Sequence, residues 1–162
     1  MDDDLKSKTP LRDKLEKEQE PKIIEIPVKW HKSMGKGSMI IATPLLVEEL
    51  VKQIPKGKLT TIKLIRERLA QDFKTDTASP LDTETFLNVI AHASEEDKAS
   101  GKKDISPYWR VLKDDGSLNP KFPNGIKNHY IHLLEEGFEF SVGESKHVIK
   151  VKDHDKVLFD FS

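Results

Sequence analysis

The sequence contains no cysteine, and this absence excludes more functions than any residue present suggests. Disulfides, thiolate metal sites and thiol nucleophiles are all excluded together. Long apolar runs are also missing, since none approaches the roughly 18 residues that a membrane-spanning helix requires. The first residues, "MDDDLKSK", are acidic and precede no apolar stretch, so we expect no secretory signal, no membrane partner and a cytoplasmic protein.

A basic excess is lacking as well. The chain has 27 basic and 28 acidic side chains, whereas nucleic-acid binders usually carry a surplus of positive charge. Any contact with DNA must therefore come from a local patch. Apolar residues make up 36% of the chain and charged residues 34%, which is typical of a charge-rich protein with a modest core. The 162 residues suffice for one domain and a tail, and we expect a monomer.

Composition and periodicity divide the chain into four parts. Residues 1–22 carry mixed charges and few core formers, which predicts a disordered charged tail with transient helix in "LRDKLEKEQE". Residues 23–42 contain two β-like runs around a glycine-rich loop and form either a connector or an edge ribbon. Residues 43–138 form the main domain. In residues 139–162, apolar and polar residues alternate, which predicts two or three short antiparallel strands.

Helical signals recur within the main domain. Thr43 is a good N-cap, and the apolar spacing after it predicts a helix that ends before Pro55. A second helix is expected from Thr60 or Thr61. A third is expected from Asp82 or Thr83, fraying in "EEDKASGKK", and a fourth over residues 124–136. Val111 and Leu112 predict a strand that turns at "DDGS" into a short returning arm. The pattern predicts a mainly helical α/β fold, a winged helix-turn-helix with a hairpin wing and C-terminal strands.

The stretch "SPYWRV" places two large rings, Tyr108 and Trp109, side by side. Neighbouring residues on a strand point to opposite faces, so both rings cannot enter the same core if this stretch is extended. We therefore expect one of the two rings to face something other than the core.

Four motifs in order resemble the DNA-binding domain of the 6-O-alkylguanine-DNA alkyltransferase family. "IPKGKLTTIKLIRERLA" is similar to the segment that opens that domain, and "SPYWRV" resembles the family's active-site "IPCHRV". "KDDGSL" occurs where the family has a short turn, and "FPNGIKNHYIHLLEEG" is similar to its C-terminal helix motif. The resemblance covers about residues 43–138.

The resemblance implies that Tyr108 occupies the position of the alkyl-accepting cysteine and Trp109 that of the histidine that helps to deprotonate it. A phenol with a pKa of about 10 is a poor substitute for an activated thiolate, and an indole accepts no proton. We therefore expect no catalysis. Alkyltransferase-like proteins, a branch that also lacks the cysteine, bind alkylated guanine without repairing it. By this analogy a lesion pocket would contain Tyr108, Trp109, Phe122 and Glu136, with Tyr108 facing an extruded base and Trp109 facing the core or a domain interface. The alternative is that both rings pack internally and the pocket is closed.

The family's other DNA contacts are altered here. Its intercalating arginine corresponds to Asn88, and its phosphate-rotating tyrosine to Ile62. Asp82 and Glu84 lie at the start of the third helix, where negative charge suits a helix N-terminus but lowers affinity for phosphate. The DNA-binding residues that we predict are Asn88, Arg110, Lys58, Lys63 and Lys113. Scattered lysines are equally typical of a solvated surface, and Arg110 could instead be a structural ion-pair partner.

These observations support two hypotheses. The first is a non-catalytic DNA-binding protein of the alkyltransferase-like type, with double-stranded DNA and a repair protein as partners and alkylated guanine as its target. The second is a winged-helix module for protein–protein interaction that has lost DNA binding. No cofactor is expected. His129 and His132 lie three residues apart on one predicted helix, but no third ligand follows at a recognisable spacing, so no metal site is expected either.

Overall fold

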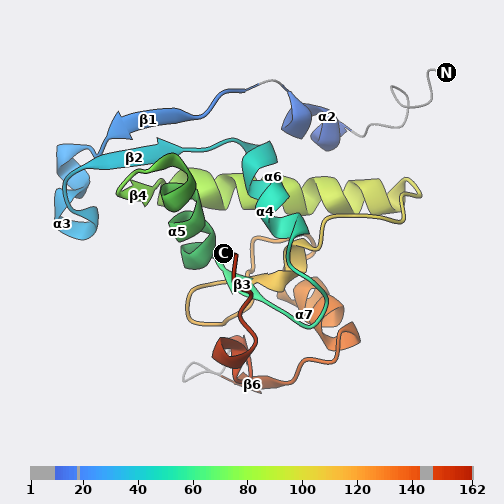
Figure 1. The fold of residues 1–162 in the computed structure, drawn as a ribbon. Helices are drawn as coiled ribbons and strands as arrows, with labels where there is room; N and C mark the ends of the chain where they lie inside the picture. Colours follow the sequence, from blue (N-terminus) through green and yellow to red (C-terminus); the bar gives the residue numbers. More distant parts are fainter. Residues whose placement is uncertain (1–9, 18, 143–147, 162) are drawn as a thin grey trace.

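The structure is a computed structural model that describes residues 10–17, 19–142 and 148–161. It is a mixed α/β protein in which helices predominate and the sheets are small, which confirms the predicted class. A long central helix, α6 (Pro80–Ala99), passes between a sheet on one side and α7 (Gly125–Glu135) on the other (Figure 1).

The N-terminal sheet has three strands in the order β1-β2-β4. Strands β1 (Lys22–Glu25) and β2 (Ser38–Ile41) are antiparallel, and β4 (Thr77–Ala78) pairs with β2 in parallel. The 3-10 helix η1 (Val28–Trp30) and the short helix α3 (His31–Met34) connect β1 to β2. This pairing matches the ribbon alternative for residues 23–42. The ribbon needs glycine at position 37, where a Cβ would lie 2.1 Å from Asp76 Oδ2.

The predicted helices are present, and the first two begin after threonine caps as expected. Helix α4 (Pro44–Lys52) begins after Thr43, whose Oγ1 accepts a hydrogen bond from Leu46 N, and α5 (Ile62–Phe73) begins after Thr61, which caps Leu64 N in the same way. Each cap satisfies one of the amide groups that a helix N-terminus leaves without a partner.

Helix α6 differs from its predicted bounds at both ends. It begins at Pro80, because Ser79 caps Asp82 N and proline suits the first helical position. It continues through "EEDKA" instead of fraying there, because Ala93, Ser94 and Asp97 are buried against other elements. Tertiary contacts thus extend the helix beyond the point where composition predicts its end.

The predicted hairpin wing is not formed as expected. Strand β5 (Val111–Leu112) pairs in parallel with β3 (Thr60–Thr61), which directly precedes α5. The chain does turn at "DDGS", where Lys113 N donates to Ser117 O at 3.0 Å, but the returning arm bonds to residue 149 instead of continuing a hairpin. The winged arrangement therefore stays a prediction, as do the domain boundaries.

The expected disordered tail contains a packed helix, α2 (Pro10–Glu16). Leu15 is 1% exposed and belongs to the main core, and Arg12 pairs with two buried carboxylates, Glu48 and Asp97. The expectation of disorder is therefore wrong for residues 10–16, because these distant acids neutralise the arginine and apolar side chains of α4 and α6 receive the leucine. The first nine residues of the predicted tail lie outside the described part.

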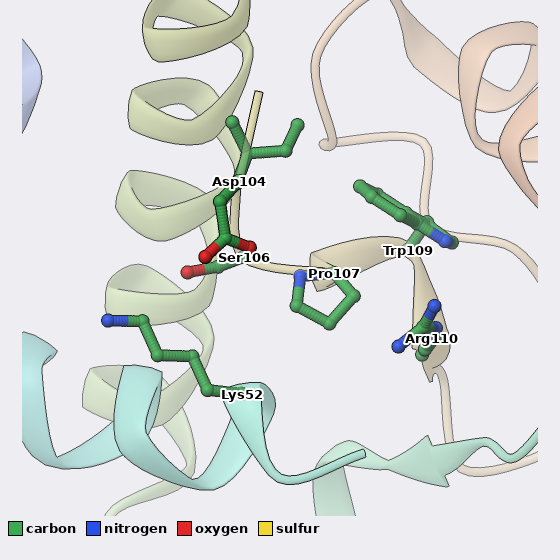
Figure 2. A pocket seen from close by; sticks show the side chains of 7 residues that line it. Lys52, Asp104, Ser106, Pro107, Trp109 and Arg110 are labelled. Atoms are coloured by element: carbon green, nitrogen blue, oxygen red, sulfur yellow. The ribbon is translucent and has the colours of Figure 1, made fainter. Parts of the chain in front are cut away.

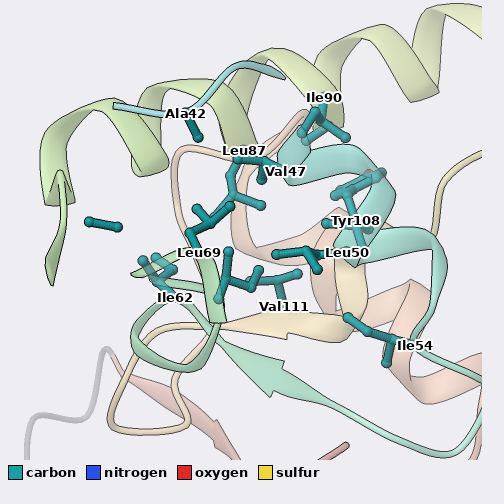
Figure 3. Packing of buried hydrophobic residues seen from close by; sticks show 14 of the residues in the cluster. Ala42, Val47, Leu50, Ile54, Ile62, Leu69, Leu87, Ile90, Tyr108 and Val111 are labelled. Atoms are coloured by element: carbon teal, nitrogen blue, oxygen red, sulfur yellow. The ribbon is translucent and has the colours of Figure 1, made fainter. Parts of the chain in front are cut away.

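Two apolar clusters hold the fold together. The larger one joins α2, α4, α5 and α6 and includes Tyr108 and Phe122 (Figure 3). The smaller one joins α7 to the C-terminal strands through Leu112, Leu133 and Val151. Trp109 packs against both clusters. A ring that contacts both clusters fixes their relative position.

The C-terminal strands agree with the prediction. Strand β6 (Phe140–Val142) pairs antiparallel with β7 (Ile149–Val151), and the short helix η3 (His154–Lys156) follows. Residues 143–147, between these two strands in the sequence, lie outside the described residues. In the part of the chain that the structure describes, no helix is long and apolar enough to span a bilayer.

Candidate functional site

The stretch that holds the two adjacent rings is helical instead of extended. Residues Tyr108–Arg110 form the 3-10 helix η2, which leads into β5. Strand alternation does not apply to such a turn. The rings of Tyr108 and Trp109 meet edge to face with centroids 5.3 Å apart. The two side chains therefore share one region of the interior instead of pointing in opposite directions.

Tyr108 is fully buried, so the expectation that its ring faces a lesion pocket is wrong. Its exposure is 0%, and Phe122, itself 2% exposed, packs edge-on against it at 5.2 Å. The phenol hydroxyl donates a hydrogen bond to Glu95 on α6. An extruded base cannot reach this ring without displacing part of the core.

Glu95 is the centre of a hydrogen-bond network that the sequence did not indicate. Its Oε2 accepts from the Tyr108 hydroxyl, from His132 Nε2 at 2.7 Å and from Asn128 Nδ2 at 3.4 Å. Burial would raise the pKa of Glu95, but the hydrogen bonds from Tyr108 and His132 outweigh it and lower that pKa. Burial, together with the neighbouring carboxylate, raises the pKa of Tyr108. Tyr108 is therefore a neutral donor to an ionised carboxylate and not a nucleophile.

Trp109 is held from two sides. Its Nε1 donates to Glu136 Oε2 at 2.6 Å, and the His132 ring stacks on it with centroids 4.1 Å apart and planes 7° apart. Arg110 donates to the same Glu136 through Nε at 3.0 Å and to Ile54 O through Nη1 at 2.6 Å. Glu136 thus fixes the orientation of the indole. Arg110 is the structural ion-pair partner that the sequence left as an alternative.

His129 is the second buried histidine of α7. Its Nδ1 accepts from Asn119 N at 3.1 Å, so Nε2 carries the proton and donates to Trp109 O at 2.8 Å. Burial lowers the pKa of His129 to about 4. No group of three metal-ligating side chains occurs among the described residues. The neutral imidazole is therefore a structural link between α7, η2 and residue 119.

This link predicts a pH dependence of stability. The folded-state pKa of His129 lies below its unfolded value of about 6.5, so the unfolded chain binds the extra proton first. The stabilisation from neutral His129 is fully present above about pH 6.5. It is lost as the pH drops toward 4, which lowers the free energy of unfolding by at most about 3 kcal/mol. Urea unfolding at pH 7, 6 and 5 should show this loss. In His129→Gln, the free energy of unfolding should depend less on pH. An equal pH dependence in the variant would assign the loss to other groups.

A cavity lies beside Trp109, on the side of α4. This Trp109 cavity has a volume of about 440 Å³. Its lining, shown in Figure 2, consists of Lys52, Asp104, Ile105, Ser106, Pro107, Trp109 and Arg110. Pockets for small ligands usually have volumes of about 300–1,000 Å³ and combine apolar walls with a few polar groups. Trp109, and not Tyr108, is thus the ring that faces a hollow.

Two lysine-rich segments border the Trp109 cavity. Residues 52–58 and 100–107, called here the basic segments, contribute five lysines and one acidic residue, Asp104. These lysines are Lys52, Lys56, Lys58, Lys102 and Lys103. In a chain with net charge −1, such a local surplus is a marked asymmetry. The two segments carry a local surplus of basic residues that whole-chain composition does not show.

A smaller hollow of about 120 Å³ lies over the middle of α6. This Asn88 hollow is lined by Ile62, Glu84, Asn88, Lys113, Asn119, Pro120 and Lys121. It combines two lysines with a carboxylate, and the buried Oδ1 of Asn88 has no hydrogen-bond partner among the described residues. Lys63 lies nearby, because its backbone N–H donates to Asp114 in the turn after Lys113 at 2.9 Å.

The structure therefore separates the predicted DNA-binding residues into two groups. Asn88, Lys63 and Lys113 gather around the Asn88 hollow, where acidic side chains offset the lysines. Lys58 belongs to the basic segments, and Arg110 lines the cavity between them. Sequence reasoning missed Lys52 and Lys121 as lining residues and Glu95 as an organising carboxylate. For Lys52 the one available signal was its position at the start of the lysine-rich run 52–58, which begins at the last residue of α4.

Comparisons with known proteins give one structural likeness. No protein-family model matches the chain, and neither does any curated protein. Among solved structures, the chain is similar to S. pombe Atl1, crystallised in complex with damaged DNA containing O6-carboxymethylguanine. The similarity has a TM-score of 0.49 and 19% identity, and it covers 72% of this chain and 94% of that one.

Proposed function

We propose that this chain is a non-catalytic DNA-binding protein whose contact surface is formed by the basic segments. The observation that carries the proposal is the presence of five lysines on the two segments that also contribute lining residues to the Trp109 cavity. Phosphate neutralisation by lysine supplies most of the sequence-independent affinity for DNA. The order of four sequence motifs that resemble an alkyltransferase domain supports the same class of ligand.

The absence of catalysis follows from the chemistry of the site residues. The position that resembles the alkyl acceptor holds a phenol that is neutral and bonded to Glu95. The position that resembles the general base holds an indole bonded to Glu136. Neither group offers an activated nucleophile or accepts a proton at neutral pH.

Recognition of alkylated guanine requires a pocket that accepts the base. The buried Tyr108 ring does not line such a pocket. We therefore expect this protein to bind duplexes with and without 6-O-methylguanine with similar affinity. A preference of tenfold or more for the modified duplex would restore the lesion-binding hypothesis. Fluorescence anisotropy with the two duplexes measures the ratio directly.

The surface itself is tested by a pair of matched variants. Lys56, Lys58 and Lys103 are exposed and have no ion-pair partner among the described residues. If each neutralises one phosphate, affinity falls about 40-fold between 50 and 200 mM salt, and the triple alanine variant at these positions loses this dependence. The control replaces Lys29, Lys32 and Lys36, which lie on and around α3, and changes the net charge equally. Equal loss in both variants would refute the assigned surface.

A second candidate function, protein–protein interaction, is favoured by a different hollow. A depression of about 430 Å³ between α3 and the start of α6 is lined in part by Trp30, Met34 and Leu81. Leu81 is 66% exposed, and Val28 on η1 is 81% exposed. Apolar side chains gathered in this way often mark a partner site. Leu81→Asp should leave DNA affinity unchanged if the basic segments bind DNA, and it should abolish partner binding if this hollow is the functional one.

A further inference from the structure

We propose that the Trp109 cavity binds a single nucleotide unit, with its base packed against the Trp109 ring and its phosphate at Lys52. The inference rests on the proposed function, which assigns a nucleic-acid ligand to the surface of the basic segments. It adds a defined subsite within that surface, and the nucleotide bound there is not base-paired. The cavity shares no lining residue with the Asn88 hollow, so the two can be tested separately.

The aromatic wall of the cavity is prepared for stacking. His132 covers one face of the Trp109 ring, and the hydrogen bond from Nε1 to Glu136 fixes the ring's orientation. His132 is itself held by Glu95 at 2.7 Å. Figure 2 shows the ring standing above Pro107, across the cavity from Lys52. A base that entered here would extend an existing stack of indole on imidazole, and bases of any sequence stack on aromatic side chains.

The cationic side of the cavity depends on Lys52. Its side chain is 54% exposed, and its Nζ lies 4.0 Å from Glu48 Oε1. That carboxylate is already engaged, because Arg12 Nη1 approaches Oε1 to 2.7 Å and Ser106 Oγ donates to Oε2 at 2.8 Å. Arg12 thereby neutralises the acid that would otherwise hold the lysine. The ammonium group remains available to an anion in the cavity.

Asp104 also lines the cavity and its carboxylate opposes an anionic ligand, but the other groups fit a nucleotide. Ile105 and Pro107 add apolar side chains to the lining, and a volume of about 440 Å³ falls within the usual range for a small ligand. Arg110 is engaged with Glu136 and Ile54, and its guanidinium lies over the Trp109 ring with Cζ 5.9 Å from the centroid, so a bound base would contact both groups. The neighbouring lysines of the basic segments favour an anionic ligand over a neutral one. An aromatic ring and an ammonium group across one cavity are complementary to a base that carries a phosphate.

The test uses the full chain in a Trp30→Phe background, so that Trp109 is the fluorescent tryptophan. Deoxyadenosine 5′-monophosphate is titrated while its quenching of Trp109 is followed, and calorimetry supplies the affinity. Deoxyadenosine and inorganic phosphate are titrated in parallel. We expect the nucleotide to bind at least tenfold more tightly than either fragment, and Lys52→Met to remove at least tenfold of that affinity. Lys29→Met, beside Trp30, serves as the matched control and should have no effect.

Two outcomes overturn the inference. One is nucleotide binding no tighter than that of phosphate alone, and the other is binding that Lys52→Met leaves unchanged. A 5′-phosphorylated single-stranded trinucleotide distinguishes the two sources of the ligand. If it binds more tightly than the mononucleotide, the site accepts a nucleic-acid strand. If the two bind equally, the site accepts a free nucleotide. Duplex binding measured separately keeps the two proposals apart. A protein that binds duplex without nucleotide quenching refutes this subsite alone, and one that quenches without binding duplex refutes the proposed function alone.

Discussion

Arg12→Met should destabilise the protein by about 3–5 kcal/mol, the largest effect we expect from a single charged side chain. Arg12 is 7% exposed and pairs with Glu48 at 2.7 Å and with Asp97 at 3.0 Å. These two carboxylates are 1% and 5% exposed, so removal of the cation leaves buried charge without its main partner. Urea unfolding followed by tryptophan fluorescence measures the loss.

Two controls define the cause. Lys14 lies on the same helix, but its side chain is exposed. Lys14→Met should therefore change the free energy of unfolding by less than about 0.5 kcal/mol. The triple variant Arg12→Met, Glu48→Gln, Asp97→Asn removes all three charges and should recover part of the loss. A cost below about 1 kcal/mol for Arg12→Met would show that α2 contributes little to the folded state.

Tyr108→Ala should cost about 3–5 kcal/mol, because it deletes a ring with no exposed surface and leaves a cavity among Trp109, Phe122 and His132. Tyr108→Phe should cost only about 1 kcal/mol, since Glu95 keeps its hydrogen bonds from His132 and Asn128. Thermal and urea unfolding of the two variants give both values.

The milder variant also tests function. Because the phenol is enclosed, Tyr108→Phe should bind duplex DNA as the natural chain does, with or without 6-O-methylguanine. A tenfold loss of affinity in a variant that remains folded would place the hydroxyl in contact with DNA. That result would contradict the enclosed position described here.

Local signals predicted the elements of the fold well. Thr43 and Thr61 were recognisable as caps because a side-chain oxygen before an apolar helical pattern satisfies the first free amides. The pairing of β3 with β5 was not predictable, since strands of two residues carry no alternation to read. The end of α6 was misjudged because "EED" is typical of a solvated surface, whereas tertiary contacts bury Asp97 and engage Glu95.

The site was harder to predict than the fold, and Tyr108 shows why. The opposite-face rule holds for extended backbone, but residues 108–110 form a 3-10 turn. Whether a ring in such a turn is buried depends on partners such as Glu95 and His132, which are 13 and 24 positions away in sequence. Arg12 illustrates the same limit, because its burial depends on two acids that only the fold brings together. Pairings between distant residues leave no local pattern.

Titration of the natural chain against a fluorescent duplex at 50 and 200 mM salt tests the central claim most directly. If Lys56, Lys58 and Lys103 of the basic segments each contact one phosphate, the duplex binds at the lower concentration and loses affinity about 40-fold at the higher one. Non-specific binding to DNA has a Kd of about 1–100 μM at physiological salt and is tighter at lower salt, so absence of binding at roughly 10 μM protein in 50 mM salt would contradict the claim.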